Sequence, residues 1–204
     1  MYQTRLGKHF YKVLSRHIGK VTKAHVKAAL HVLKYLKYTK TLGLLVKPTK
    51  DPTFKIYADS SFADSKDYSS TSGWMITLYD VPVLWKCKLE SSRTLQHSHQ
   101  QLQDLNFDQK QNATCGAEYM SCSKGVEDGH FIKNLAEEFG LPLKYPALLL
   151  NDNAAAVGIM LRGNPAQSKL RHINRRIHYL VFESIVRGVI KVQYVPTNEQ
   201  HLTC

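Results

Sequence analysis

The sequence predicts an α/β domain with a mixed sheet, preceded by a basic helical segment. Two observations predict this organisation. Apolar runs of strand length come first, followed by a long helical pattern and then by strands that alternate with helices. The excess of positive charge is confined to the first quarter of the 204 residues. A composition of 43% hydrophobic and 22% charged residues is typical of a folded globular chain.

The charge distribution points to an anionic partner. Residues 1–50 contain twelve Lys or Arg and no Asp or Glu, whereas residues 51–204 contain sixteen of each sign, so the net charge of +12 lies in the first segment. Nucleic acid is favoured over a membrane surface, because this segment is not strongly apolar. A cationic solubilising face, or a fragment of a larger protein, would also account for the charge.

A helix is expected over residues 24–37, because Val26, Leu30 and Leu33 recur at helical spacing while lysines occupy the other positions. This amphipathic helix with a basic outer face stops near Gly43. A linker with two prolines follows. Residues 1–50 are therefore interpreted as a basic helical segment.

The remaining residues, 53–204, are expected to form one domain. We expect strands at 54–58, 73–79, 82–87, 146–150 and 189–195, and helices at 115–139, 154–161 and 171–187. Residues 91–112 contain six Gln and show little periodicity, so we interpret them as an exposed loop or a disordered insertion.

Several classes of protein are not expected from this sequence. It contains no window of 18 consecutive apolar residues, so no transmembrane helix is predicted. The first fifteen residues carry three basic residues and no apolar core, which is unlike a secretory signal. Four cysteines without a CxxC pair fit a reducing compartment, in which Cys115 and Cys122 would be ordinary packing residues.

Three carboxylates are candidates for catalysis because of their positions. Asp59 follows a strand, Glu118 lies in the first turn of the long helix, and Asp152 follows the fourth strand. Ligand groups converge at strand ends and helix starts in α/β sheets, and hard oxygen ligands suit Mg²⁺ or Mn²⁺. Each residue also has a structural interpretation, as a turn residue, a helix-dipole partner and an N-cap, respectively.

Two further pairs of residues have simpler interpretations. His97 and His99 form an HSH motif, but no Cys or carboxylate partner has zinc-like spacing, so a polar loop is favoured. Trp74 and Trp85 fall on predicted strands and are expected in the core.

Seven motifs occur in an order that resembles the ribonuclease H region of copia-type LTR retrotransposon polyproteins. These motifs are YADSSFAD (57–64), SSTSGW (69–74), PVLWKCK (82–88), GAEYM (116–120), LLNDNAAAVG (149–158), SKLRHINRRIHY (168–179) and YVPTNEQ (194–200). Residues 25–46 also resemble the connection that precedes that region. The sequence lacks a polymerase palm with its paired aspartates.

The resemblance implies a ribonuclease H-like fold, with a mixed five-stranded sheet flanked by helices. It also implies endonucleolytic hydrolysis of the RNA strand of RNA–DNA hybrids, with two Mg²⁺ ions that Mn²⁺ can replace. The catalytic and metal-binding carboxylates of the family fall on Asp59, Glu118 and Asp152. Asp59 would bridge both ions, and the other two would anchor one ion each.

The implied partners are an RNA–DNA hybrid or another duplex nucleic acid, and the reverse transcriptase portion of the same polyprotein, with no membrane. The candidates for phosphate contacts are basic residues of two predicted helices, Lys23, Lys27, Arg171, Arg175 and Arg176. The implied location is the cytoplasm, within a virus-like particle, or the nucleus.

The sequence departs from the family at three acidic positions. The fourth carboxylate of the family falls on Thr203 or is missing, and Gly116 and Asn174 stand where carboxylates are usual. These departures and the 91–112 insertion favour a degenerate enzyme. They leave open a non-catalytic nucleic-acid-binding remnant with the same fold.

Two other classes of protein fit less well. An integrase-type strand-transfer domain uses two aspartates and a later glutamate, an order that Asp59, Asp152 and Glu183 would imitate. The GAEYM motif on the central helix and the lack of a Cys/His zinc module argue against it. A structural protein without affinity for nucleic acid leaves the N-terminal charge unexplained.

Overall fold

The computed structural model describes residue 14 and residues 18–41, 46–61, 70–89, 107–162 and 175–200. The chain divides into two compact units, Met1–Val46 and Lys47–Cys204. The functional division of the sequence at residues 50–53 stays a prediction.

The first unit contains η1 (Ile18–Lys20) and helix α2 (Lys23–Tyr38), so the helix predicted over 24–37 is confirmed. The helix starts at Thr22, whose hydroxyl accepts a hydrogen bond from the His25 N–H at 3.4 Å, while His25 Nδ1 accepts from the Thr22 N–H at 3.2 Å. This reciprocal capping satisfies two amides that the first helical turn leaves unpaired. The helix ends at Tyr38, before the expected stop near Gly43.

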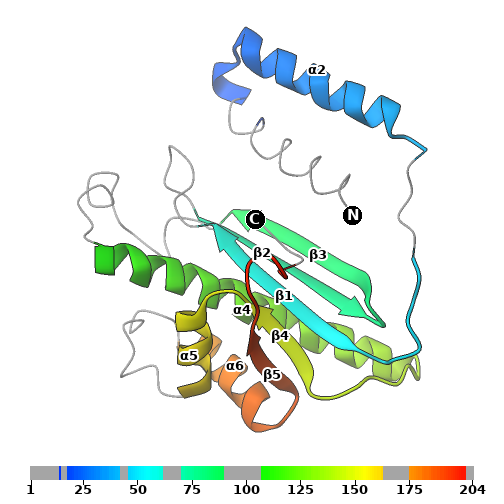
Figure 1. Cartoon of the computed structure of the whole chain (residues 1–204), viewed down its shortest axis with the longest axis vertical. Coiled ribbons are helices and arrows are strands. Elements are labelled where there is room, and N and C mark those ends of the chain that lie inside the picture. Colours follow the sequence, from blue (N-terminus) through cyan, green and yellow to red (C-terminus); the bar gives the residue numbers. More distant parts are fainter. Residues whose placement is uncertain are drawn as a thin grey trace. The chain divides into compact units, whose positions relative to one another are not determined.

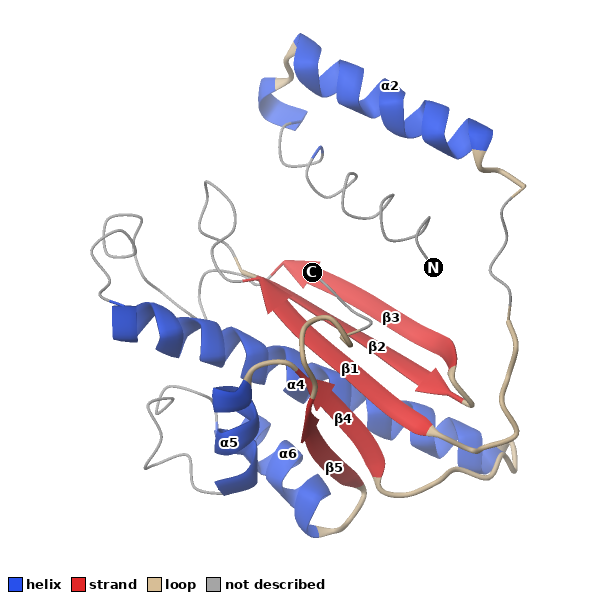
Figure 2. Cartoon of the chain, in the orientation of Figure 1, coloured by secondary structure: helices blue, strands red, loops and turns tan. Residues whose placement is uncertain are grey.

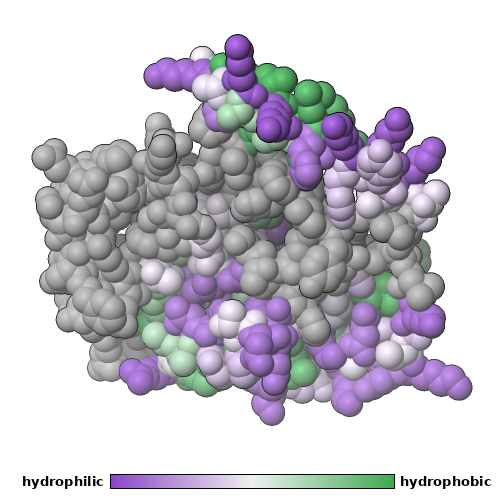
Figure 3. All heavy atoms as spheres, turned by 45° about the horizontal axis from the view of Figure 1, so that its top comes forward, coloured by the Kyte–Doolittle hydropathy of each residue, from purple (hydrophilic) through white to green (hydrophobic). Residues whose placement is uncertain are grey.

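The apolar stripe of α2 is itself exposed to a large extent. Val26, Leu30 and Leu33 are 49%, 53% and 61% exposed. In Figure 3, hydrophobic and hydrophilic side chains lie beside one another along this helix. The basic face is therefore not its only solvent-facing surface.

The second unit is built on five strands (Figures 1 and 2). They are β1 (Phe54–Ser61), β2 (Thr71–Leu78), β3 (Val81–Leu89), β4 (Ala147–Asn151) and β5 (Ile190–Tyr194). Their order is β3-β2-β1-β4-β5, in which the first three strands are antiparallel and β4 and β5 run parallel to β1. The mixed five-stranded sheet that the resemblance implies is confirmed.

Within the described part of this unit, three helices pack on the sheet. They are α4 (Phe107–Glu138), α5 (Ala154–Arg162) and α6 (Arg175–Val186). Together with one face of the sheet they enclose the main core, whose buried members include Ile56, Trp74, Val126, Leu149 and Met160. The burial of Cys115 and Cys122 in the same core confirms their expected packing role.

Two predictions about the loops and the core of this unit are wrong. The segment expected as a loop over 91–112 is helical from Phe107 onward, because Gln, Lys and Ala favour helix despite their lack of apolar periodicity. Trp85 is 41% exposed, since β3 is an edge strand that pairs only with β2 in the sheet, whereas Trp74 is buried as expected. His97 and His99 lie outside the described residues.

Small residues on α4 allow it to approach the sheet closely. The hydroxyl of Ser121 lies 2.9 Å from the Asp59 carbonyl and 2.7 Å from the Gly73 carbonyl. At Gly125, a Cβ atom would lie only 2.9 Å from Ile56 Cγ2. This close packing determines how near the preceding turn of α4 lies to the end of β1.

We predict opposite effects on stability for two glycine substitutions in helices. Gly125→Ala should destabilise the protein by up to about 2 kcal/mol, because overpacking costs about 1–3 kcal/mol and the helix propensity gained returns only about 1 kcal/mol of it. Gly158→Ala in α5 should stabilise by about 0.5–1 kcal/mol, because its Cβ would meet no atom within 4 Å. Urea unfolding of both variants measures the difference, and equal effects would contradict the close approach of α4.

Candidate metal centre

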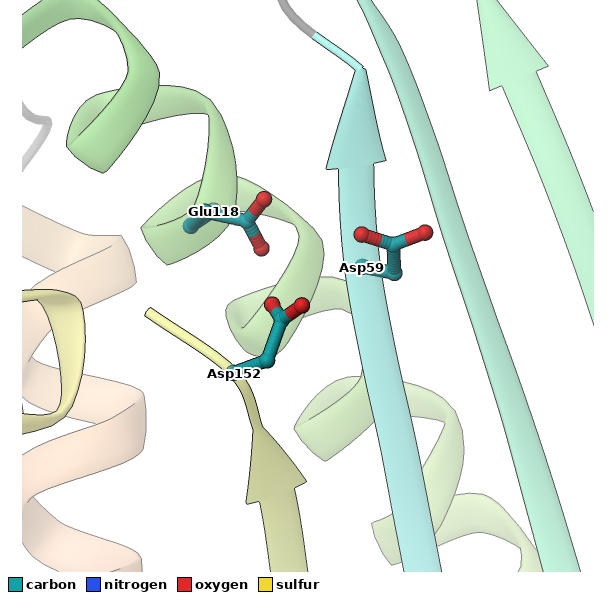
Figure 4. Close-up of side chains that lie close together, drawn as sticks. All are labelled: Asp59, Glu118 and Asp152. Carbon is teal, nitrogen blue, oxygen red and sulfur yellow. The ribbon is translucent and has the colours of Figure 1, made fainter. Parts of the chain in front are cut away.

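The carboxylates of Asp59, Glu118 and Asp152 converge at one end of the sheet. One oxygen from each side chain lies within 4.8 Å of the others. Figure 4 shows them approaching one another from β1, α4 and the end of β4. The sequence placed Asp59 and Asp152 at strand ends and Glu118 at a helix start, and the structure brings all three together.

The divergence of β1 from β4 opens the space that these carboxylates share. The two parallel strands pair only as far as Tyr57 and Leu150. Asp59 and Asp152 each lie two residues beyond that last pair, at the carboxyl ends of adjacent strands, where ligand groups converge in α/β sheets. β1 itself remains paired with β2 as far as Ser61, so Asp59 sits on regular strand.

Two buried amide side chains replace the missing ladder bonds. The Ala58 carbonyl accepts a hydrogen bond from Asn151 Nδ2 at 3.0 Å and another from Gln200 Nε2 at 2.9 Å. Both side chains are more than nine-tenths buried. Backbone carbonyls buried without a partner are costly, so these amides stabilise the gap between the strands.

Asn151 also orients Glu118. Its Nδ2 donates to Glu118 Oε2 at 2.8 Å, and its Oδ1 accepts from the Asn153 N–H at 3.0 Å. Both amide hydrogens are therefore used, and the orientation of the amide is fixed by its acceptors. Asn151 was not singled out from the sequence, and its only signal is a polar residue at the end of an apolar strand.

Glu118 is 3% exposed and lies in the interior of α4, because that helix begins at Phe107. The predicted placement in a first helical turn is wrong, and the helix-dipole interpretation falls with it. Its Oε1 accepts from the Ser60 N–H at 3.1 Å and from the Ser60 hydroxyl at 2.8 Å. Burial, and to a smaller extent the charge of Asp59, raises the pKa of Glu118 to about 7 despite these hydrogen bonds.

Asp152 is held from a different direction. Its Oδ2 accepts a hydrogen bond from the Thr197 hydroxyl at 2.9 Å. The N-cap interpretation of Asp152 is wrong, because Asn153 Oδ1 accepts from the Ala156 N–H at 3.0 Å and caps α5 instead. Asp152 is thus available for another role.

The three carboxylates supply oxygen ligands that fit a divalent cation. Carboxylate oxygens are the ligands that Mg²⁺ and Mn²⁺ prefer, and a cation would offset the mutual repulsion of the three groups. Asp59, Glu118 and Asp152 are the residues that could hold it.

The other predicted site residues fall elsewhere. Glu183 on α6 forms an ion pair at 2.7 Å with Arg187, which follows that helix. The acidic cluster within the described ranges contains Glu118 in its place, so the integrase-type arrangement is not formed. Lys23 and Lys27 are exposed on α2. Several positions have side chains outside the described part of the chain: Arg171, Asn174, Arg175, Arg176 and Thr203.

The raised pKa of Glu118 predicts a loss of stability with increasing pH in EDTA. Between its ordinary pKa of 4.5 and about 7, folded Glu118 binds a proton that the unfolded chain has released. The associated stability, about 3 kcal/mol, is fully present below pH 4.5 and is lost as pH rises through 7. Urea unfolding of the wild type should show this slope, and Glu118→Gln should remove it.

The matched control is Glu127→Gln, an exposed glutamate on the same helix. This variant should keep the pH dependence of the wild type. An identical slope in Glu118→Gln would show that Glu118 is ionised throughout the range.

Comparisons with known proteins identify relatives along nearly the whole chain, although no family model matches it. The chain is 26% identical over 189 residues to the retrovirus-related Pol polyprotein from transposon RE2 of Arabidopsis thaliana, a match that covers 92% of this chain and 12% of the polyprotein. The corresponding polyprotein from transposon TNT 1-94 of Nicotiana tabacum is 25% identical over 192 residues, a match that covers 94% of this chain and 13% of that polyprotein. The chain thus spans about an eighth of the length of these curated relatives.

The solved structures that are similar to this chain include ribonucleases H. RNase H1 from the halophilic archaeon Halobacterium salinarum NRC-1 is 13% identical, with a TM-score of 0.45 over 72% of this chain and 89% of its own. LC11-RNase H1 in complex with an RNA/DNA hybrid is 11% identical, with a TM-score of 0.47 over 73% of this chain and 89% of its own. The homologues found for this chain are retrovirus-related Pol polyproteins of plant transposons, and its own five strands form a mixed sheet flanked by helices.

Proposed function

We propose that this chain is a retrotransposon-derived ribonuclease H that hydrolyses the RNA strand of RNA–DNA hybrids. The supporting observation is the convergence of Asp59, Glu118 and Asp152 at the diverging ends of β1 and β4, in a homologue of Pol polyproteins. Among the described residues, no helix is long and apolar enough to cross a membrane.

In this proposal, the three carboxylates hold two Mg²⁺ ions, which Mn²⁺ can replace. Bound ions of this kind activate water and stabilise the charge on a leaving oxygen. As the resemblance implies, Asp59 would contact both ions, and Glu118 and Asp152 would anchor one ion each. Ser60 and Asn151 hold the Glu118 carboxylate in place, so that it does not have to reorganise when a substrate arrives.

The substrate is proposed to be read by its backbone and shape, with little dependence on base sequence. Lys23 and Lys27, and the three arginines at and before the start of α6, would contact phosphates. The reverse transcriptase portion of the same polyprotein would supply the hybrid, in a virus-like particle in the cytoplasm or in the nucleus.

Cleavage of an end-labelled RNA–DNA hybrid tests the proposal. With Mg²⁺ the RNA strand should be cut while a DNA duplex of the same sequence stays intact. Asp152→Asn should lower the rate on the order of 100-fold or more, because one ion loses a charged ligand. Glu127→Gln, remote from the carboxylates, should cleave like the wild type. Intact hybrid at all metal concentrations would exclude the proposed reaction.

A second candidate function is binding of nucleic acid without cleavage. Two observations favour it. The carboxylate cluster within the described residues has three members, whereas the family that the sequence resembles has a fourth carboxylate. All the net positive charge of the chain lies in residues 1–50, where it can attract nucleic acid without taking part in cleavage. Hybrid retention without cleavage in the same assay would select this function.

We predict that the basic face of α2 contributes to affinity for duplex DNA. Each phosphate neutralised contributes about 0.9 to the slope of log affinity against log salt, so Lys23→Gln with Lys27→Gln should flatten the slope by about 2. Titrations between about 50 and 200 mM salt measure this slope. The control replaces Lys144 and Lys191, exposed lysines of the second unit, and should leave it unchanged. An unchanged slope in the α2 variant would move the binding surface elsewhere.

A further inference from the structure

We propose that Thr197 is a positioning residue of the metal centre, where its hydroxyl orients the Asp152 carboxylate. The inference rests on the proposed function, because it concerns how one carboxylate is presented to a cation. It assigns a role to residues 195–200, which follow β5 and contribute no acidic group to the cluster. We call these six residues the post-β5 segment.

The post-β5 segment makes hydrogen bonds with both strands that carry the site. The Val195 N–H donates to the Asn151 carbonyl at 3.0 Å, which continues the contact of β5 with β4. The Thr197 hydroxyl donates to Asp152 Oδ2 at 2.9 Å. Gln200 Nε2 then donates to the Ala58 carbonyl on β1 at 2.9 Å. The segment thus spans the gap between β4 and β1.

Local geometry keeps Thr197 in place even though its own side chain is exposed. Val195 and Gln200, at the two ends of the segment, are 8% and 7% exposed. Between them, the N–H groups of Glu199 and Gln200 donate to the Pro196 carbonyl at 2.9 and 3.1 Å and form a tight turn. Two buried ends and one closed turn leave the Thr197 hydroxyl little freedom to leave Asp152.

The hydroxyl suits this task chemically. A threonine hydroxyl can donate one hydrogen bond, so it fixes one Asp152 oxygen without adding charge to the cluster. The partners that orient ligating carboxylates affect metal affinity although they do not touch the metal. Thr197 thus does for Asp152 what Ser60 and Asn151 do for Glu118.

The test compares three variants of the full chain by calorimetric titration with Mn²⁺ alone. Thr197→Val removes the hydroxyl and keeps the side-chain shape, and it should weaken Mn²⁺ binding about fivefold. Thr197→Ser restores the hydroxyl and should bind within about twofold of the wild type. The control is Thr49→Val, because the exposed Thr49 hydroxyl lies 3.5 Å from an aspartate outside the cluster, Asp80. It should bind Mn²⁺ like the wild type.

The outcomes separate this inference from the proposed function. Equal Mn²⁺ affinity in the wild type and Thr197→Val would overturn the positioning role and leave the metal centre standing. Equal weakening by Thr197→Ser and Thr197→Val would also overturn it, because the hydroxyl would then not be the cause. A wild type that binds no Mn²⁺ would overturn both proposals. Thermal unfolding in EDTA should give the same midpoint for all variants, as expected of an exposed position.

Discussion

The site depends on the Ala58 carbonyl, which lies just beyond the last residue pair that joins β1 to β4. A carbonyl at this depth needs donors, and two side-chain amides, Asn151 and Gln200, supply them. Because Asn151 uses its second hydrogen on Glu118, the same residue closes the sheet and orients a carboxylate. Without the divergence of the strands there would be no space for the carboxylates, and without the amides the gap would be unstable.

Electrostatics makes this arrangement costly for the fold. Burial of Glu118, and to a smaller extent the charge of Asp59, disfavours the ionised form of Glu118 and raises its pKa. The hydrogen bonds from Ser60 and Asn151 offset only part of that cost. A proton or a cation would relieve the remainder. An arrangement that is unfavourable for stability is therefore also one that is suited to bind a cation.

Most of the sheet and the identity of the clustered carboxylates could be predicted from the sequence. Apolar runs marked the strands, and motif order pointed to Asp59, Glu118 and Asp152. The residues that orient them could not be predicted, because Asn151 and Gln200 contact Ala58 across 93 and 142 residues and leave no local pattern. The start of α4 was missed because its first turns contain polar helix formers that show no apolar period. Edge exposure, as at Trp85, depends on strand order, which periodicity does not reveal.

The contact between Gln200 and Ala58 has a consequence for biosynthesis. During translation, β1, the β2–β3 hairpin and α4 leave the ribosome before the residue that donates to Ala58 has been made. At about 5–20 residues per second, the 142 residues between the two partners represent roughly 7–30 seconds of synthesis. Closing so long a loop also carries an entropic cost that short-range contacts avoid. The hydrogen bond from Gln200 to Ala58 can therefore form only after the residues of the hairpin and of the central helix have been synthesised.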